Sequence, residues 1–500
     1  MTEQPGSRDA PPRASAMVEA LRGLGYSPAT AIADIIDNSI SAGAGTVSIQ
    51  FLWAGTDSSI LIIDDGRGMN ESELDLAMRL GERSPLETRS VADLGRFGLG
   101  LKTASFSQCR RLTVVSRRDG KTSALRWDLD VLLADVKGRW SLLEGLHPGS
   151  DKRLAPFKGK EAGTAVLWEI PDRIVSAMHD EQEFLDVMDA VERHLGMVFH
   201  RFLESRKLRI LINDHPVRPW DPFLEGRLDT WRSGEDRFTV NGSPIRVQGF
   251  VLPHRDRLDP KTWESAAGPH GWTTQQGFYV YRNDRLLLAG SWLGLGRGRS
   301  WTKDEPYRLA RIRIDIPNAA DADWKIDIRK STARPPLEAR PRLTVLAEDV
   351  RARARRVFAF RGKPQAVGKR EPLVQAWHAD RTKDGIRYRI DTTHPAIAAV
   401  LEDAGASAGA LRAMLRVIEE TVPVQQIWLD TAEARDTPPI AVPANPPEDV
   451  HRLMQRVLSG FVRRKGLSLE AARAQLARTE PFDSWPAYIA TLEMSPETSA

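Results

Sequence analysis

The sequence has a single cysteine and no long apolar run. Cys109 stands alone in 500 residues, which excludes an internal disulfide and a zinc site built from cysteines, and fits a reducing compartment. No apolar run approaches the roughly 20 residues that span a bilayer, and the opening residues, MTEQPGSRDAPPRASA, lack the apolar core of a signal peptide. These absences predict a cytoplasmic protein with a disordered leader over residues 1–16.

Net charge is also small. A charge of +4 spread over so long a chain does not identify a nucleic-acid-binding protein. Cations gather in the run RARARR at residues 351–356 and again between residues 361 and 370. Two interpretations are equally open: a basic strip suited to phosphate backbones, or a solvated helix face.

The chain is long enough for several domains, because one hydrophobic core rarely serves 500 residues. Its content of 41% hydrophobic and 28% charged residues is that of an ordinary globular protein. Alternating helix-like and strand-like segments predict an α+β fold. The predicted parts are a leader (1–16), a first α+β domain (17–205), a second, strand-rich α+β domain (206–335), a helix with a basic linker (336–370) and a mainly helical C-terminal region (371–500).

The stretch ADIIDNSISAGAG, residues 33–45, carries acids in an otherwise apolar helix. Ile32, Ile36 and Ile40 fall on one stripe at helical spacing. Asp34, Asn38 and Ser41 fall on another stripe. An amphipathic surface helix with solvated acids would explain the pattern, so its meaning depends on the rest of the chain.

Three further patterns follow that helix in order. They are DDGRGM at residues 64–69 after a predicted hairpin, GRFGLGLK at 95–102, and Gly163-Thr164 entering a strand. Each is weak alone, because glycine turns more often support tight packing than phosphate binding. Together they indicate a nucleotide site, because its components need different residue types.

The chemistry of such a site assigns these patterns to its parts. Glycines let backbone N–H groups approach phosphates, and GRFGLGLK runs into a helix. A purine needs an acceptor for its exocyclic amine, and Asp64 at a strand end suits that role. Magnesium takes hard oxygen ligands, a role for the side-chain oxygen of Asn38. Hydrolysis needs a carboxylate near the attacking water, and Asp34 lies one helical turn from Asn38.

At these residues the chain resembles the GHKL superfamily of ATPases, which includes the gyrase B subunit, MutL, MORC proteins and heat-shock chaperones. ADIIDNSISAGA is similar to the N-box, DDGRGM and GRFGLGLK to the first two glycine boxes, and GTAVLWEI to the third. The resemblance covers about residues 17 to 175. It implies a Bergerat-type two-layer α/β sandwich that binds ATP and Mg²⁺ and acts as an ATPase.

The resemblance also implies residue roles. Asp34 would be the catalytic carboxylate, Asn38 the magnesium ligand and Asp64 the adenine reader, with residues 81–98 forming a lid. Gly66, Gly68 and Thr164 would support the adenine pocket, and Gly95, Gly98, Gly100 and Lys102 would enclose the phosphates. The other residues expected to bind the nucleotide are Met69, Phe97, Leu99 and Leu101 in the same glycine boxes.

This chain departs from the family pattern at two positions of the N-box. The family usually has glutamate at the position of Asp34, and the shorter side chain retracts the carboxylate by about 1.5 Å. Hydrolysis is then expected to be slow unless the backbone compensates. Asp37 is the neighbouring alternative for the catalytic role. Ser41 replaces a later acid and removes one negative charge.

The second domain is similar to the transducer domain of the superfamily, on QGFYVYRNDRLLLAGSW and ADWKIDIRKSTARPP. By position Lys330 resembles the transducer lysine that reaches the terminal phosphate, although a solvated lysine at a strand end would fit as well. A histidine-kinase arrangement is disfavoured, because the first histidine is His147 and only a short leader precedes the first domain.

The resemblance implies a molecular clamp in which ATP orders the lid and brings two subunits together. DNA is the first expected client, in a bacterial DNA-processing or phage-defence (antiviral) system. A chaperone-like ATPase with a protein client is the competing class, and a nucleotide-binding scaffold that hardly hydrolyses ATP is the third. Protein partners are expected in each case. The C-terminal region contains no motif with assignable chemistry.

Overall fold

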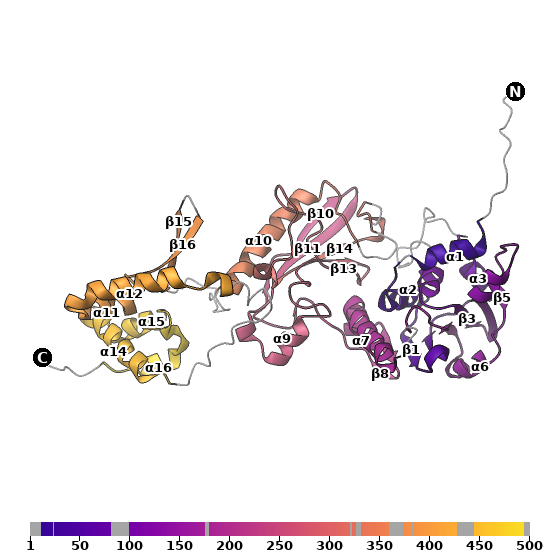
Figure 1. Ribbon diagram of the computed structural model, residues 1–500, viewed down its shortest axis with the longest axis horizontal. Coiled ribbons are helices and arrows are strands. Elements are labelled where there is room, and N and C mark those ends of the chain that lie inside the picture. The colour runs from indigo at the N-terminus through magenta and orange to yellow at the C-terminus, as the bar shows by residue number, and fades with distance from the viewer. Residues whose placement is uncertain are drawn as a thin grey trace, which may run out of the picture. The chain divides into compact units, whose positions relative to one another are not determined.

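The computed structural model describes residues 12–23, 25–81, 100–175, 180–320, 323–326, 332–359, 374–382, 385–427 and 445–494. Its contacts divide the chain into two compact units, residues 1–362 and 363–500 (Figure 1). None of the described helices is long and apolar enough to cross a membrane.

The first unit opens on a sheet whose described strands follow the order β5-β4-β3-β6-β2-β1-β7-β8. Neighbours are antiparallel except β1 and β7, which are parallel. The strands are β1 (Thr46–Leu52), β2 (Ser59–Asp64), β3 (Arg111–Arg118), β4 (Lys121–Asp128), β5 (Leu143–Glu144), β6 (Gly163–Glu169), β7 (Arg209–Ile212) and β8 (His215–Pro216).

The central strands of this sheet are buried on both faces. Along β2, Ile60 and Ile62 join the main core, and Leu61 and Ile63 join a smaller cluster on the opposite face. This division follows from the two-residue period of a strand. β1 and β2 form the predicted hairpin, with Val47 paired to Asp64. The result is the predicted α+β class, with helices and a mixed sheet in one domain.

Helices pack on the first sheet, most of them on its main face. They are α1 (Ala14–Arg22), α2 (Pro28–Ser41), α3 (Glu71–Met78), α4 (Gly100–Phe106), α5 (Leu129–Ala134), α6 (Ser150–Arg153), α7 (Glu181–Val198) and α8 (His200–Glu204). Helix α6 leads into Leu154 and Phe157 of the cluster on the opposite face. Helices α1 and α2 are separate, and the chain between them contains Gly23 and Gly25. Because α1 begins at Ala14, the last three residues of the predicted leader belong to it.

The first sheet extends past residue 205, where the sequence placed the domain boundary. β7, read from the sequence as part of the second domain, pairs in parallel with β1, so that Thr46 lies opposite Arg209. The sequence could not show this pairing, because a short apolar strand carries no mark of the sheet it joins.

A second sheet follows in the same unit, in the order β10-β11-β14-β12-β13, with β9 paired to β11. Its elements are β9 (Trp231–Arg232), β10 (Asp236–Val240), β11 (Ser243–Val251), β12 (Gly277–Arg282), β13 (Arg285–Ser291) and β14 (Ala310–Ile316), with helices α9 (Pro260–Ala266) and α10 (Arg340–Ala359). The two faces of β12 pack differently. Phe278 and Val280 pack in the core that includes α10, whereas Tyr279 and Tyr281 join the core of the first sheet.

The basic-strip interpretation is wrong for one arginine of α10, because that side chain lies in the core. Arg351 is buried, and its guanidinium lies over the rings of Trp292 and Tyr307, 4.5 and 3.6 Å from their centroids. Burial lowers its pKa below the usual value. Every third or fourth residue of a helix faces the core, and here one of those residues is an arginine. Arg355 and Arg356 are exposed. The cations at 361–370 lie outside the described residues.

The second unit is mainly helical, as predicted, but it also contains a hairpin that the sequence did not indicate. β15 (Trp377–Thr382) pairs with β16 (Gly385–Ile390). The helices are α11 (Pro395–Asp403), α12 (Ala408–Thr421), α14 (Glu448–Arg463), α15 (Leu469–Leu476) and α16 (Pro486–Thr491). Their core includes Met454, Leu458, Leu476 and Phe482.

Candidate functional site

Helix α2 positions Asp34 and Asn38. Ser27 caps the helix: its hydroxyl accepts the N–H of Thr30 at 3.2 Å in a capping box, and Pro28 is in the first turn. Asp34 is only 8% exposed, whereas Asn38 is exposed. The polar stripe of the sequence therefore has a buried carboxylate at one turn and an accessible amide at the next.

The carboxylate of Asp34 lies where α2 meets the start of α4. Tyr26 donates its hydroxyl to Asp34 Oδ2 at 3.1 Å. A Cβ added to Gly100, the first residue of α4, would lie 3.8 Å from the same oxygen. The N-box and the end of the GRFGLGLK motif, more than 60 residues apart in the sequence, are therefore neighbours in the fold.

Asp64, at the end of β2, is a buried acceptor that binds three donors. Its Oδ1 accepts the N–H groups of Gly66 at 2.9 Å and Thr164 at 3.2 Å. Its Oδ2 accepts the hydroxyl of Ser39 at 2.9 Å. Burial raises the pKa of Asp64, and these hydrogen bonds offset part of that effect. A carboxylate oxygen has two lone pairs, so Oδ2 keeps one acceptor position beyond Ser39.

Three glycines let the backbone close around Asp64. Gly68 has φ +68°, and a Cβ there would lie 1.9 Å from the carbonyl oxygen of Arg117. Gly163 has φ +133°, and its Cβ would lie 2.2 Å from the carbonyl oxygen of Asp64. A Cβ on Gly66 would lie 2.9 Å from that of Ala42. The close contacts at all three positions, together with the positive φ of Gly68 and Gly163, exclude larger residues, whatever ligand the site binds.

Two hydroxyls that the sequence did not single out complete this part of the site. Ser39 contacts Asp64, as described above. Ser116 accepts the N–H of Met69 at 2.8 Å and lies 2.9 Å from the hydroxyl of Thr164. The sequence did contain a signal for Ser116. A serine in the apolar strand LTVVS is expected to be buried, and a buried hydroxyl needs a polar partner.

Lys102, predicted at the phosphates, and Asp37, the alternative acid of α2, both have partners within the protein. Lys102 is 3% exposed and donates its ammonium to the carbonyl oxygen of Ala77 at 2.9 Å, near the C-terminus of α3. Asp37 pairs with Arg285 of the second domain. Because Asp37 is paired with Arg285, Asp34 is the acid of α2 that lies beside Gly100. Leu101, next to Lys102, packs partly buried against the main core.

The remaining predicted residues lie outside the described residues: Gly95, Phe97, Gly98, Leu99 and Lys330, together with positions 82–98 of the predicted lid. In the described part of the chain no three histidine, cysteine or acidic side chains are grouped to hold a metal ion. A magnesium ion held by one protein oxygen and by phosphates needs no such group.

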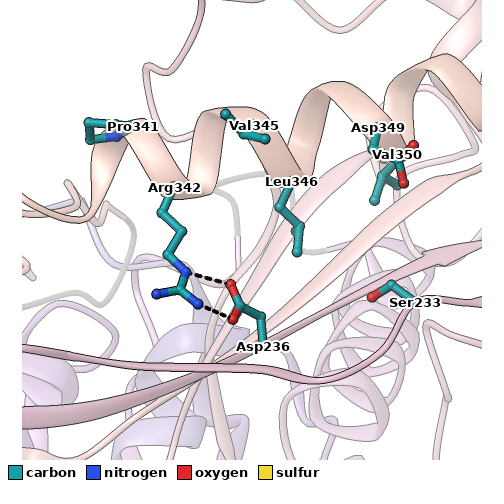
Figure 2. A pocket seen from close by; sticks show the side chains of 8 residues that line it. All are labelled: Ser233, Asp236, Pro341, Arg342, Val345, Leu346, Asp349 and Val350. Atoms are coloured by element: carbon teal, nitrogen blue, oxygen red, sulfur yellow. Dashed lines mark hydrogen bonds and ion pairs between the residues drawn. The ribbon is translucent and has the colours of Figure 1, made fainter.

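A hollow on the second domain is separate from these residues. Figure 2 shows it between α10 and the strands beside it, lined by Ser233, Asp236, Pro341, Arg342, Val345, Leu346, Asp349 and Val350. Arg342 donates from Nε to Asp236 at 2.7 Å across it. None of the predicted nucleotide residues lines it.

Comparison with known proteins agrees with the geometry around Asp34 and Asp64. Residues 26–153 match the family described as histidine kinase-, DNA gyrase B-, and HSP90-like ATPase. The chain is 36% identical over 105 residues to the DNA mismatch repair protein MutL of Rhodospirillum rubrum, covering 21% of this chain and 16% of that protein. It is 34% identical over 98 residues to the ATPase morc-1 of Caenorhabditis elegans, covering 20% and 11%. Over 171 residues it is 32% identical to MutL of Rhodopseudomonas palustris, covering 33% and 26%.

The first domain is therefore an ATPase domain of the GHKL superfamily, similar to those of MutL and MORC proteins. The chain spans about a quarter or less of the length of these relatives.

Proposed function

We propose that this protein binds ATP at α2, the end of β2 and the start of α4, and hydrolyses it with Mg²⁺. The observation that supports this most is that one helix contacts both ends of the site. Through Ser39, α2 contacts Asp64, and through Asp34 it lies beside Gly100. A ligand that spans an adenine acceptor and a phosphate-binding turn has the extent of a nucleotide.

The side chains fit the parts of such a ligand. The second lone pair of Asp64 Oδ2 accepts the exocyclic amine of adenine. Asn38 offers an exposed amide oxygen, a hard ligand suited to magnesium, whose charge would stabilise the phosphates during transfer. Asp34 orients and deprotonates the attacking water, and Tyr26 holds its carboxylate.

Turnover of ATP by Asp34→Ala tests this assignment. We expect Asp34→Ala to lose at least about 100-fold in turnover, the usual range for a positioned base, while it still binds ATP. Asp57→Ala is a matched control, because Asp57 is an exposed acid in a short turn. Equal turnover by the intact protein and Asp34→Ala would remove Asp34 from the mechanism.

We further infer that ATP closes two copies of the chain into a clamp and that DNA is the client. The similarity to MutL and MORC proteins supports this inference, as do the exposed cations of α10. Duplex binding that weakens steeply as salt rises is expected, because phosphate contacts release counterions. The mass of the intact protein should double with ATP, and its measurement with and without DNA tests both parts. Absence of duplex binding at low salt would favour the protein-client alternative.

One observation favours a scaffold that hardly hydrolyses ATP. The side chain of Asp34 is shorter than that of glutamate, is only 8% exposed, and accepts a hydrogen bond from Tyr26. A carboxylate misplaced by about 1 Å costs on the order of 100-fold in rate. Tight ATP binding without measurable turnover by the intact protein would support this alternative.

A further inference from the structure

An arginine of the second domain contacts the N-box helix. β12 and β13 are joined by a tight turn at Asn283 and Asp284, with φ of 48° and 66°. Such a turn has left-handed backbone at both positions and matches the twist of a hairpin. Arg285 is the first residue after it. Its side chain binds Asp37 on α2 in the first domain.

The contact is a buried ion pair. Arg285 Nε lies 3.1 Å from Oδ1 and 3.2 Å from Oδ2 of Asp37. Arg285 is 4% exposed and Asp37 is 1% exposed. The guanidinium also lies over the ring of Phe199, 5.3 Å from its centroid. Removal of either partner would leave the other charge buried without this ion pair, which is far costlier than loss of a surface pair.

Asp37 occupies a position that links this pair to the candidate site. On α2 it lies three residues after Asp34 and directly before Asn38. Its backbone carbonyl accepts the hydroxyl of Ser41 at 2.9 Å, within the same turn. A helix moves as a rigid element over so few residues, so a shift or rotation at Asp37 moves Asp34 and Asn38 with it.

The hairpin that carries Arg285 is itself fixed to the first domain at a second place. Tyr281, on β12, shares a 2.8 Å hydrogen bond with His200 of α8. Arg201, the next residue, pairs with Asp315 of β14 and lies over the ring of Tyr281. The second sheet is thus anchored at α8, and Arg285 contacts α2.

We propose that Arg285 is a positioning residue for ATP hydrolysis: it holds α2 so that Asp34 and Asn38 face the nucleotide, and it couples the second domain to the site. This inference rests on the proposed ATPase function. It differs from the expected role of Lys330, because Arg285 binds the helix that carries the site and not the nucleotide.

Arg285→Met and Asp37→Asn test the proposal. Each single variant should lose at least about tenfold in turnover, because a misplacement of about 1 Å costs on the order of 100-fold. The dissociation constant of ATP should change less than the turnover, since Asp64 keeps the backbone donors of Gly66 and Thr164, which do not belong to α2. Arg285→Lys keeps a charge without the planar fork and should recover only part of the turnover.

The double variant, Asp37→Asn with Arg285→Met, separates positioning from stability. Because both charges of the pair are removed together, neither is left buried alone, and the melting temperature should return toward that of the intact protein. Its turnover should stay low, because α2 has lost its fixed contact. Arg201→Met is the comparison variant: it removes the pairs of Arg201 with Asp315 and Asp284 but leaves Arg285 paired with Asp37. It should therefore lose clearly less turnover than Arg285→Met.

Each outcome has one meaning. Single variants that turn over ATP like the intact protein overturn the positioning role, as does a double variant that recovers stability and turnover together. An equal loss of turnover in Arg201→Met and Arg285→Met also overturns it, because domain contact in general would then explain the effect. Absence of ATP binding by the intact protein refutes the proposed function instead.

Discussion

Asp64→Asn changes one oxygen of the adenine acceptor into a donor. The amide oxygen is expected at the Oδ1 position, where it still accepts the N–H groups of Gly66 and Thr164. The amide nitrogen then takes the Oδ2 position. The Ser39 hydroxyl can rotate and accept a hydrogen bond there, but the amine of adenine would face another donor. A buried donor left unpaired costs about 2–3 kcal/mol, so ATP affinity should fall by roughly 30- to 150-fold.

Calorimetric titration of ATP and inosine triphosphate provides the assay. Inosine presents a carbonyl oxygen where adenine presents an amine, so the intact protein should prefer ATP and Asp64→Asn should reverse or abolish that preference. Burial raises the pKa of Asp64, so the neutral asparagine should not lower the melting temperature. Equal affinity of the intact protein for the two nucleotides would refute the assignment of Asp64, as would unchanged ATP affinity in the variant.

Three further predictions concern stability and rate. Gly68→Ala should destabilise the protein severely, because its Cβ would lie 1.9 Å from the Arg117 carbonyl oxygen. Gly43→Ala, with a similar positive φ and nothing within 4 Å, should cost only about 1–2 kcal/mol, and comparable urea midpoints would contradict the steric argument. Burial lowers the pKa of His194 from 6.5 to about 3. Between these two pH values the unfolded chain binds one more proton than the folded protein. The free energy of unfolding should therefore fall as the pH drops from about 6.5 toward 3, by at most about 1.4 kcal/mol per pH unit. His194→Gln should reduce that slope in urea unfolding at a series of pH values, and an unchanged slope would contradict the prediction. Asp34→Glu should raise ATP turnover, up to about 100-fold, if the short carboxylate limits the rate; an unchanged or lower rate would show that it does not.

Local patterns predicted much of the first domain. The capped helix α2, the β1–β2 hairpin and the turn after Asp64 follow from residue spacing, because each is set by neighbours within a few positions. The proximity of Asp34 and Gly100 was expected only through the resemblance of ordered motifs. The partners of Asp64 were partly missed, because Ser39 and Thr164 reach it from elements far apart in the sequence.

The sequence by itself determined the class of the first domain, since its motifs are local and their order is preserved along the chain. Only the tertiary structure decided that β7 completes the first sheet, that Arg351 stacks in a core and that Arg285 binds Asp37. The physical reason is the same in all three cases: an apolar strand or an arginine has many acceptable partners. Long-range packing determines which partner is bound, and the neighbouring residues in the sequence do not indicate it.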